Sequence, residues 1–221
     1  HFVGQTDYGV YQSSNSFVFS LTLLTFGFSE AYVRFYMRLR TKRDESGIKK
    51  LNGTYLLLYA VICLIALVLG LIFSANAELI FSKGFTSQEI SLARVLLAIM
   101  TVNISLTLFS TVFDAFIVAH ERFVFQQSRQ MFTALAAPLL SFLLLEMGMG
   151  TVGVALAQLA VTVVLLALNV RFAVGQLGMR FQFRGFDFSL LKAIAAFSAW
   201  IFANQICELA NQNLPNILLG A

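Results

Sequence analysis

Seven of the chain's fifteen lysine and arginine side chains lie within the seventeen residues from Arg34 to Lys50, between two long apolar runs. Only 12% of all residues are charged, so this stretch is strongly enriched. In proteins that span a bilayer, short loops rich in Lys and Arg lie on the cytoplasmic side. The alternative is a solvated loop that only improves solubility, and the alternation of basic residues along the rest of the chain disfavours it. The stretch therefore predicts two membrane helices joined by a cytoplasmic loop.

Composition agrees with this class. The 221 residues are 58% hydrophobic, with a mean hydropathy of +0.80, which is more apolar surface than a soluble domain of this size can bury. The formal charge of +4 lies mostly in short loops, so anionic lipid headgroups, and not nucleic acid, are the expected neighbours. Cys63 and Cys207 fall inside apolar runs, which predicts buried or lipid-facing thiols and no disulfide. We expect an all-α membrane protein.

About six segments are long enough to cross roughly 30 Å of hydrocarbon. They cover approximately Val10–Val33, Leu51–Phe73, Leu92–Val118, a stretch from the AHERF turn to Leu145, Val152–Phe172 and Leu190–Asn211. If the first residues are extracytoplasmic, thirteen Lys and Arg side chains fall on the inner side and two, Lys83 and Arg94, on the outer side. The chain begins without Met, and if the intact protein starts in the cytoplasm, this orientation implies at least one earlier helix. We therefore expect a fragment that starts at the second helix of a larger bundle.

Polar side chains recur on single faces of these segments, which indicates a protein interior or a wet cavity and not lipid. One face of the first segment holds Gln12, Ser16, Glu30 and Arg34, with Asn15 nearby; the third segment holds Asn103, Thr107, Ser110 and Asp114; the last holds Trp200, Asn204 and Glu208. A carboxylate at the depth of Asp114 needs a partner or water. Two simpler readings stay open: Glu30 pairs with Arg34 along its own helix, and the other polar groups bond between helices.

Motifs of soluble enzymes are missing from the sequence. It contains no glycine-rich phosphate loop, no zinc-ligand spacing and no nucleophile elbow. Its two histidines are His1 and His120, and a solvated loop residue is the expected state of His120. We therefore expect no catalytic activity, no cofactor and no metal site.

A family resemblance begins with the opening stretch, GQTDYGVYQSSNSFVFSLTLLTFGFSEAYVRFY. It resembles the region around the second helix of the bacterial polysaccharide flippases, in the multidrug, oligosaccharidyl-lipid and polysaccharide exporter superfamily. The matching positions are Gly4, Tyr8, Gly9, Tyr11, Gly27, Arg34 and Phe35. AHERF resembles the cytoplasmic turn after the family's fourth helix, and FDFSLLKAIAAFSAWIFANQI resembles the start of its second half. The chain departs from the family at Leu214, Pro215 and Asn216, where an Asp-Lys/Arg pair is often found.

The resemblance implies a two-lobe transporter of twelve to fourteen helices with a central cavity that opens to each side in turn. Residues 1–172 would form helices two to six of the N-terminal lobe, residues 173–189 the cytoplasmic link, and residues 190–221 the first helix of the C-terminal lobe. The substrate would be an oligosaccharide or polysaccharide repeat unit on an isoprenoid diphosphate, flipped across the bacterial cytoplasmic membrane. Membrane lipids and the polysaccharide polymerase machinery would be partners.

Such a substrate needs a cation for the diphosphate and amide, carboxylate and aromatic groups for the sugars. The cation expected is Arg34. The predicted cavity residues are Arg34, Glu30, Gln12, Asn15, Asp114, Trp200, Asn204 and Glu208. A multidrug exporter and a peptidoglycan-precursor flippase of the same superfamily remain alternatives, and Arg34 with the basic loops argues weakly against the first. A membrane-embedded transferase would need larger extramembrane loops.

Overall fold

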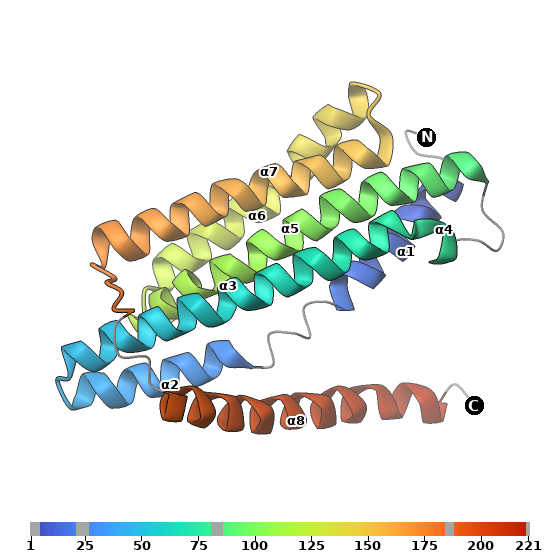
Figure 1. Cartoon of the computed structure of the whole chain (residues 1–221). Helices are drawn as coiled ribbons and strands as arrows, with labels where there is room; N and C mark the ends of the chain where they lie inside the picture. The colour runs from blue at the N-terminus through green and yellow to red at the C-terminus, as the bar shows by residue number, and fades with distance from the viewer. Residues whose placement is uncertain (1–4, 21–26, 81–85, 184–187, 220–221) are drawn as a thin grey trace.

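The computed structural model describes residues 5–20, 27–80, 86–183 and 188–219, and this part of the chain is helical without a strand (Figure 1). The helices are α1 (Gln5–Ser20), α2 (Phe28–Thr41), α3 (Glu45–Ala75), α4 (Ala77–Ile80), α5 (Ser87–Ala119), α6 (Phe123–Glu146), α7 (Gly150–Val170), the π-helical turn η2 (Arg171–Gln176) and α8 (Phe188–Leu219). The predicted all-α class is therefore confirmed.

Four helices of the described part are long and apolar enough to span a membrane: α3, α5, α6, and α7 continued by η2. The chain is thus a helical membrane protein with four candidate spans. The described apolar part of α8 covers only Phe188–Asn204. The predicted count of about six spans is not confirmed.

The first predicted segment, Val10–Val33, is not one continuous helix. Gly27 has a φ of +69°, in the left-handed region, so no single α-helix can run through it. α1 ends before this point and α2 begins directly after it. Residues 21–26 lie outside the described part. The prediction of one shared helical face is therefore wrong for Gln12, Ser16, Glu30 and Arg34.

Most of the basic stretch is helical and only residues 42–44 form a turn. α2 ends with Arg38 and Arg40 in its last turn, where positive charge is favourable beside the free carbonyl groups. Asp44 begins α3 as its N-cap and accepts a hydrogen bond of 2.9 Å from the Gly47 amide. The basic loop expected from the sequence is therefore a tight helix-turn-helix junction.

Three connections meet at one end of the bundle, on the left in Figure 1: residues 42–44, residues 120–122 and the segment after η2. Tyr36 and His120 are hydrogen bonded at 2.9 Å, and Asn52 donates to the Arg180 carbonyl at 2.9 Å. The alternation of helices predicted that these basic connections share one end. Arg129 was counted with them, but it lies inside α6.

α5 is the central helix and packs against α1, α2, α3 and α7. A cluster of buried tyrosines joins α2 to α3, with Tyr32 and Tyr55 edge to face at 4.8 Å between ring centroids. α1 is tied to α7 because Gln158 donates to the Tyr11 hydroxyl at 3.0 Å. α6 contacts α7 and contains no buried residue, and the large apolar side chains that it exposes suit contact with lipid. α8 packs mainly against α2.

Candidate functional site

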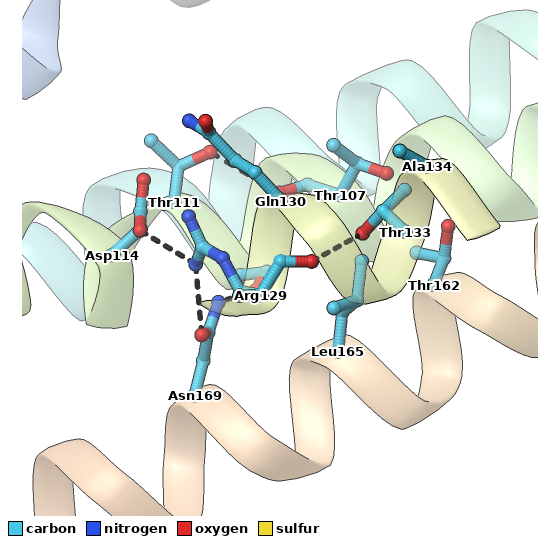
Figure 2. A pocket seen from close by; sticks show the side chains of 11 residues that line it. Thr107, Thr111, Asp114, Arg129, Gln130, Thr133, Ala134, Thr162, Leu165 and Asn169 are labelled. Carbon is cyan, nitrogen blue, oxygen red and sulfur yellow. Dashed lines mark hydrogen bonds and ion pairs between the residues drawn. The ribbon is translucent and has the colours of Figure 1, made fainter. Parts of the chain in front are cut away.

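A polar cavity of about 430 Å³ lies between α5, α6 and α7, within three of the four candidate spans (Figure 2). α5 contributes Asp114 and a row of hydroxyl groups, α6 contributes Arg129, and α7 contributes Asn169. The hydroxyl-bearing residues of the lining are Thr107, Ser110, Thr111, Thr133 and Thr162. Each helix turns a polar face inward, as helices do around a polar interior in a membrane.

Arg129 lies at the centre of the site, as Figure 2 shows. Its Nη1 atom is 2.6 Å from Asp114 Oδ1 and donates a hydrogen bond of 2.8 Å to Asn169 Oδ1. The N–H direction does not point at Asp114 Oδ1, so that contact is a charge pair and not an aligned hydrogen bond. The side chains of Arg129 and Asp114 are 15% and 30% exposed, so both charges are partly desolvated.

Asn169 connects the charge pair to α5. It is buried, accepts from Arg129 and donates a hydrogen bond of 2.9 Å from Nδ2 to Ser110 Oγ. An amide side chain can accept through its oxygen and donate through its nitrogen at once, and Asn169 uses both. The network therefore holds α5, α6 and α7 in one arrangement.

Several groups around the pair can still accept hydrogen bonds. The hydroxyls of Thr107, Thr111 and Thr133 each donate to the carbonyl four residues earlier in their own helix, which leaves oxygen lone pairs as acceptors. Pro138 lies inside α6 and cannot donate to the carbonyl of Ala134, which lines the cavity. The cavity therefore offers acceptors from α5 and α6 next to one guanidinium.

This arrangement suits the binding of a polar group. It places one cation and one anion in a cavity together with neutral amide and hydroxyl groups. In the described part, no three His, Cys, Asp or Glu side chains are grouped in a way that would hold a metal ion. The site can bind a polar, charged group within an otherwise apolar bundle.

Of the predicted cavity residues, Asp114 lines this site. The sequence predicted that Asp114 needs a partner or water, and the partner in the structure is Arg129. Gln12 and Asn15 are exposed on α1, Glu30 and Arg34 on α2, and Trp200 and Asn204 on α8, while the side chain of Glu208 lies outside the described residues. Glu30 and Arg34 form no ion pair with each other. Apart from Asp114, the predicted residues whose side chains are described do not line this cavity.

Arg34 lines a different cavity, of about 400 Å³, between α2 and α8. Its guanidinium carbon lies 4.2 Å from the centre of the Phe197 ring, which is the geometry of a cation–π contact. Arg38 shares this cavity. The predicted diphosphate ligand Arg34 is therefore partnered by an aromatic ring of α8.

Arg129 was not predicted as a site residue, because its place among the basic residues of the inner side indicated a loop. A signal was present in the sequence. Gln130 and Thr133 lie on a polar face of the helix that contains Arg129, and Thr162 and Asn169 lie on a polar face of the helix that follows it. Three consecutive helices with one polar face each predict a shared polar interior. An arginine next to such a polar face on one of these helices is the expected counter-ion for Asp114.

Comparison with protein-family models, with curated proteins and with solved structures finds no match for this chain.

Proposed function

We propose that this protein translocates an amphiphile with a charged, sugar-bearing head, an isoprenoid-diphosphate-linked oligosaccharide or polysaccharide repeat unit, across the bacterial cytoplasmic membrane. The supporting observation is the Asp114–Arg129 pair in a polar cavity between candidate membrane spans. Partly desolvated charges inside membrane helices are costly and mark substrate or ion pathways. The proposed activity is transport, and it makes and breaks no covalent bond.

The lining chemistry suits such a head group. A guanidinium binds phosphate through a fork of parallel N–H groups. Both contacts of Arg129 use the same atom, Nη1, so they occupy only part of that fork. Amide and hydroxyl groups of the kind contributed by Asn169 and Thr111 are hydrogen-bond partners for sugar hydroxyls.

Asp114 would compete with the phosphate for the guanidinium of Arg129. While it holds Arg129, the guanidinium is neutralised. An arriving diphosphate would take over part of the fork, and departure of the product would restore the pair. Alternating access in a two-lobe bundle would then couple this exchange to movement of the head group across the membrane.

The test uses the full-length gene in its source cells. Deletion should remove surface polysaccharide and leave the lipid-linked repeat unit in the inner leaflet. Wild-type complementation should restore export, while Arg129→Gln should fail because it removes the phosphate-binding fork. Expression and membrane insertion are checked by immunoblot of membrane fractions.

A matched control is the other ion pair of the described part, Arg94–Glu78, at 2.9 Å with side chains 47% and 71% exposed. Arg94→Gln removes the same charge outside the cavity and should export normally. If both arginine variants export normally, the proposed site is wrong. If the deletion strain retains its polysaccharide but becomes sensitive to lipophilic cations, a multidrug exporter is the better description.

A further inference from the structure

A second polar cavity, of about 400 Å³, lies where three connections meet at the basic end of the bundle. It lies between the start of α3, the α5–α6 turn and the segment that follows η2. The polar residues that line it are Tyr36, Glu45, Lys49, Asn52, His120 and Arg180. None of them belongs to the cavity around Arg129.

One wall is formed by α3 and the segment after η2, held together by hydrogen bonds. Tyr32 donates to Asn52 Oδ1 at 2.6 Å, and Asn52 Nδ2 donates to the Arg180 carbonyl at 2.9 Å. The main-chain N–H of Gln182 donates a hydrogen bond of 3.0 Å to the main-chain carbonyl of Lys49. Asn52 is only 1% exposed, so this is a rigid and desolvated contact.

The opposite wall is the α5–α6 turn with His120. His120 Nδ1 lies 2.8 Å from the Phe116 carbonyl, which can only accept, so Nδ1 carries the proton. In the neutral imidazole Nε2 is then an acceptor, and the Tyr36 hydroxyl donates a hydrogen bond of 2.9 Å to it. Burial lowers the pKa of His120, and the charges of Arg40 and Arg122 lower it further.

The two cations that line the cavity have side chains that take no part in the hydrogen bonds of this wall. Lys49 and Arg180 hold the wall together through their main-chain carbonyls, and the ion pairs of the described part are formed elsewhere. Glu45 is the single acidic residue of the lining. Positive charge is therefore in excess in the lining, and Arg40 and Arg122 add to it from outside.

The depth of the cavity suits a lipid headgroup. Lys49 lies on α3 directly before the apolar stretch that begins at Leu51, so its ammonium group is placed where hydrocarbon gives way to water. Basic pockets at the ends of membrane helices bind the phosphates of anionic lipids.

We propose that this cavity binds a phosphate group between Lys49 and Arg180, from an anionic phospholipid headgroup or from a soluble phosphate ester. A phosphate there would bridge α3 to the segment after η2, beside the α5–α6 turn. Binding would therefore hold three connections in the arrangement described. The site is independent of the transported substrate.

The test uses the purified full-length protein in nanodiscs of phosphatidylcholine, with phosphatidylglycerol or inorganic phosphate as the probe. Native mass spectrometry counts retained lipids, and the melting temperature reports stabilisation by bound ligand. We expect Lys49→Gln/Arg180→Gln to weaken binding at least about tenfold, since a bidentate charge-assisted contact is lost. Both substitutions keep the main-chain bonds of the wall, so the variant should fold. Arg180→Gln alone, with a smaller expected loss, is the fallback.

The control Lys42→Gln/Arg43→Gln removes the same charge from the turn at the same end, outside the cavity. It should retain nearly wild-type binding. Equal losses in both double variants would mean general surface attraction and overturn the site, as would unchanged binding in Lys49→Gln/Arg180→Gln. Stabilisation by phosphatidylglycerol alone identifies a lipid site, and stabilisation by inorganic phosphate identifies a site for soluble esters. In either case the His120 pKa, followed by NMR, should rise when the anion binds.

Discussion

Gly70 of α3 lies so close to Thr101 of α5 that a β-carbon on Gly70 would overlap the Thr101 side chain. Thr101 is fully buried, and its β-branched side chain has few rotamers into which it could move. This contact brings two candidate membrane-spanning helices, α3 and α5, close together, as small residues do between membrane helices.

Gly70→Ala should therefore destabilise the bundle. Alanine favours a helix over glycine by about 1 kcal/mol, but overpacking a close contact costs about 1–3 kcal/mol. Thermal unfolding in detergent measures the balance. Gly175→Ala is the control, because a β-carbon there meets nothing within 4 Å and should stabilise slightly. Adding Thr101→Ser to Gly70→Ala removes the methyl group and should recover part of the loss, whereas independent effects would exclude this contact as the cause.

The pair between Asp114 and Arg129 should contribute to stability as well as to binding. Arg129→Gln leaves a partly buried carboxylate without its counter-ion, which should cost up to about 3 kcal/mol, the lower end of the range for buried pairs. The double variant Arg129→Gln/Asp114→Asn should lose less stability than the sum of the losses of the two single variants. Thermal unfolding of the four proteins gives the coupling energy. Strict additivity would show that the 2.6 Å contact contributes nothing.

The pKa of His120 predicts a pH dependence. Because burial and nearby arginines lower this pKa below 6.5, the unfolded chain binds a proton more readily than the folded one. The contribution to stability is complete above pH 6.5 and is lost as the pH falls from there through the folded-state pKa. Protonation also removes the acceptor of the Tyr36 hydroxyl and adds charge beside Arg40 and Arg122.

Melting temperatures between pH 7.5 and pH 5, in phosphate-free buffer and zwitterionic detergent, measure this effect. The wild type should lose stability across that range, and His120→Gln should lose less. The side chain of glutamine does not titrate and keeps an amide near the Tyr36 hydroxyl. An identical pH profile for the two proteins would assign the effect to other groups.

The orientation of the chain in the membrane can be tested with single cysteines. Ser46, at the start of α3, and Ser87, at the start of α5, are exposed at opposite ends of the bundle. In a Cys63→Ala/Cys207→Ala background, Ser87→Cys should react with an impermeant thiol reagent in intact cells. Ser46→Cys should react only after permeabilisation. The reverse pattern would place the basic end outside.

The sequence was sufficient for the class of the fold and for most helix positions, because long apolar runs and the alternation of charge are local signals. The break at Gly27 was not recognised, since a single glycine inside an apolar run is compatible with a membrane helix. The helical start of α3 was also missed, because charged residues in a first turn resemble a loop when only hydrophobicity is considered.

The candidate site could be predicted only in part. Asp114 and the polar faces of α5 to α7 were visible, because each lies within one helix. The pairing of Asp114 with Arg129 and the role of Asn169 depend on how three helices are rotated against one another, which a single sequence does not specify. For the same reason, the contact of Arg34 with Phe197, which lies 163 positions further along the chain, could not be predicted.

Arg34 provides the sharpest test of the sequence-based substrate hypothesis. If it binds the diphosphate, Arg34→Ala should abolish glycan export with normal membrane insertion, and Arg34→Lys should retain part of it, because a point charge remains while the bidentate fork is lost. The contact with Phe197 offers a different role, in which Arg34 only holds α8 against α2.

Phe197→Leu separates the two roles, because it removes the aromatic face and leaves the guanidinium and much of the apolar packing in place. A substrate ligand predicts nearly normal export for Phe197→Leu and failure for Arg34→Ala. A purely structural clamp predicts a similar loss of stability for both variants, each of about 0.5–1 kcal/mol as for an exposed cation–π pair, and nearly normal export by both. The comparison uses complementation of surface polysaccharide, with expression measured by blot. Full export by Arg34→Ala would exclude Arg34 from substrate binding and leave Arg129 as the proposed phosphate ligand.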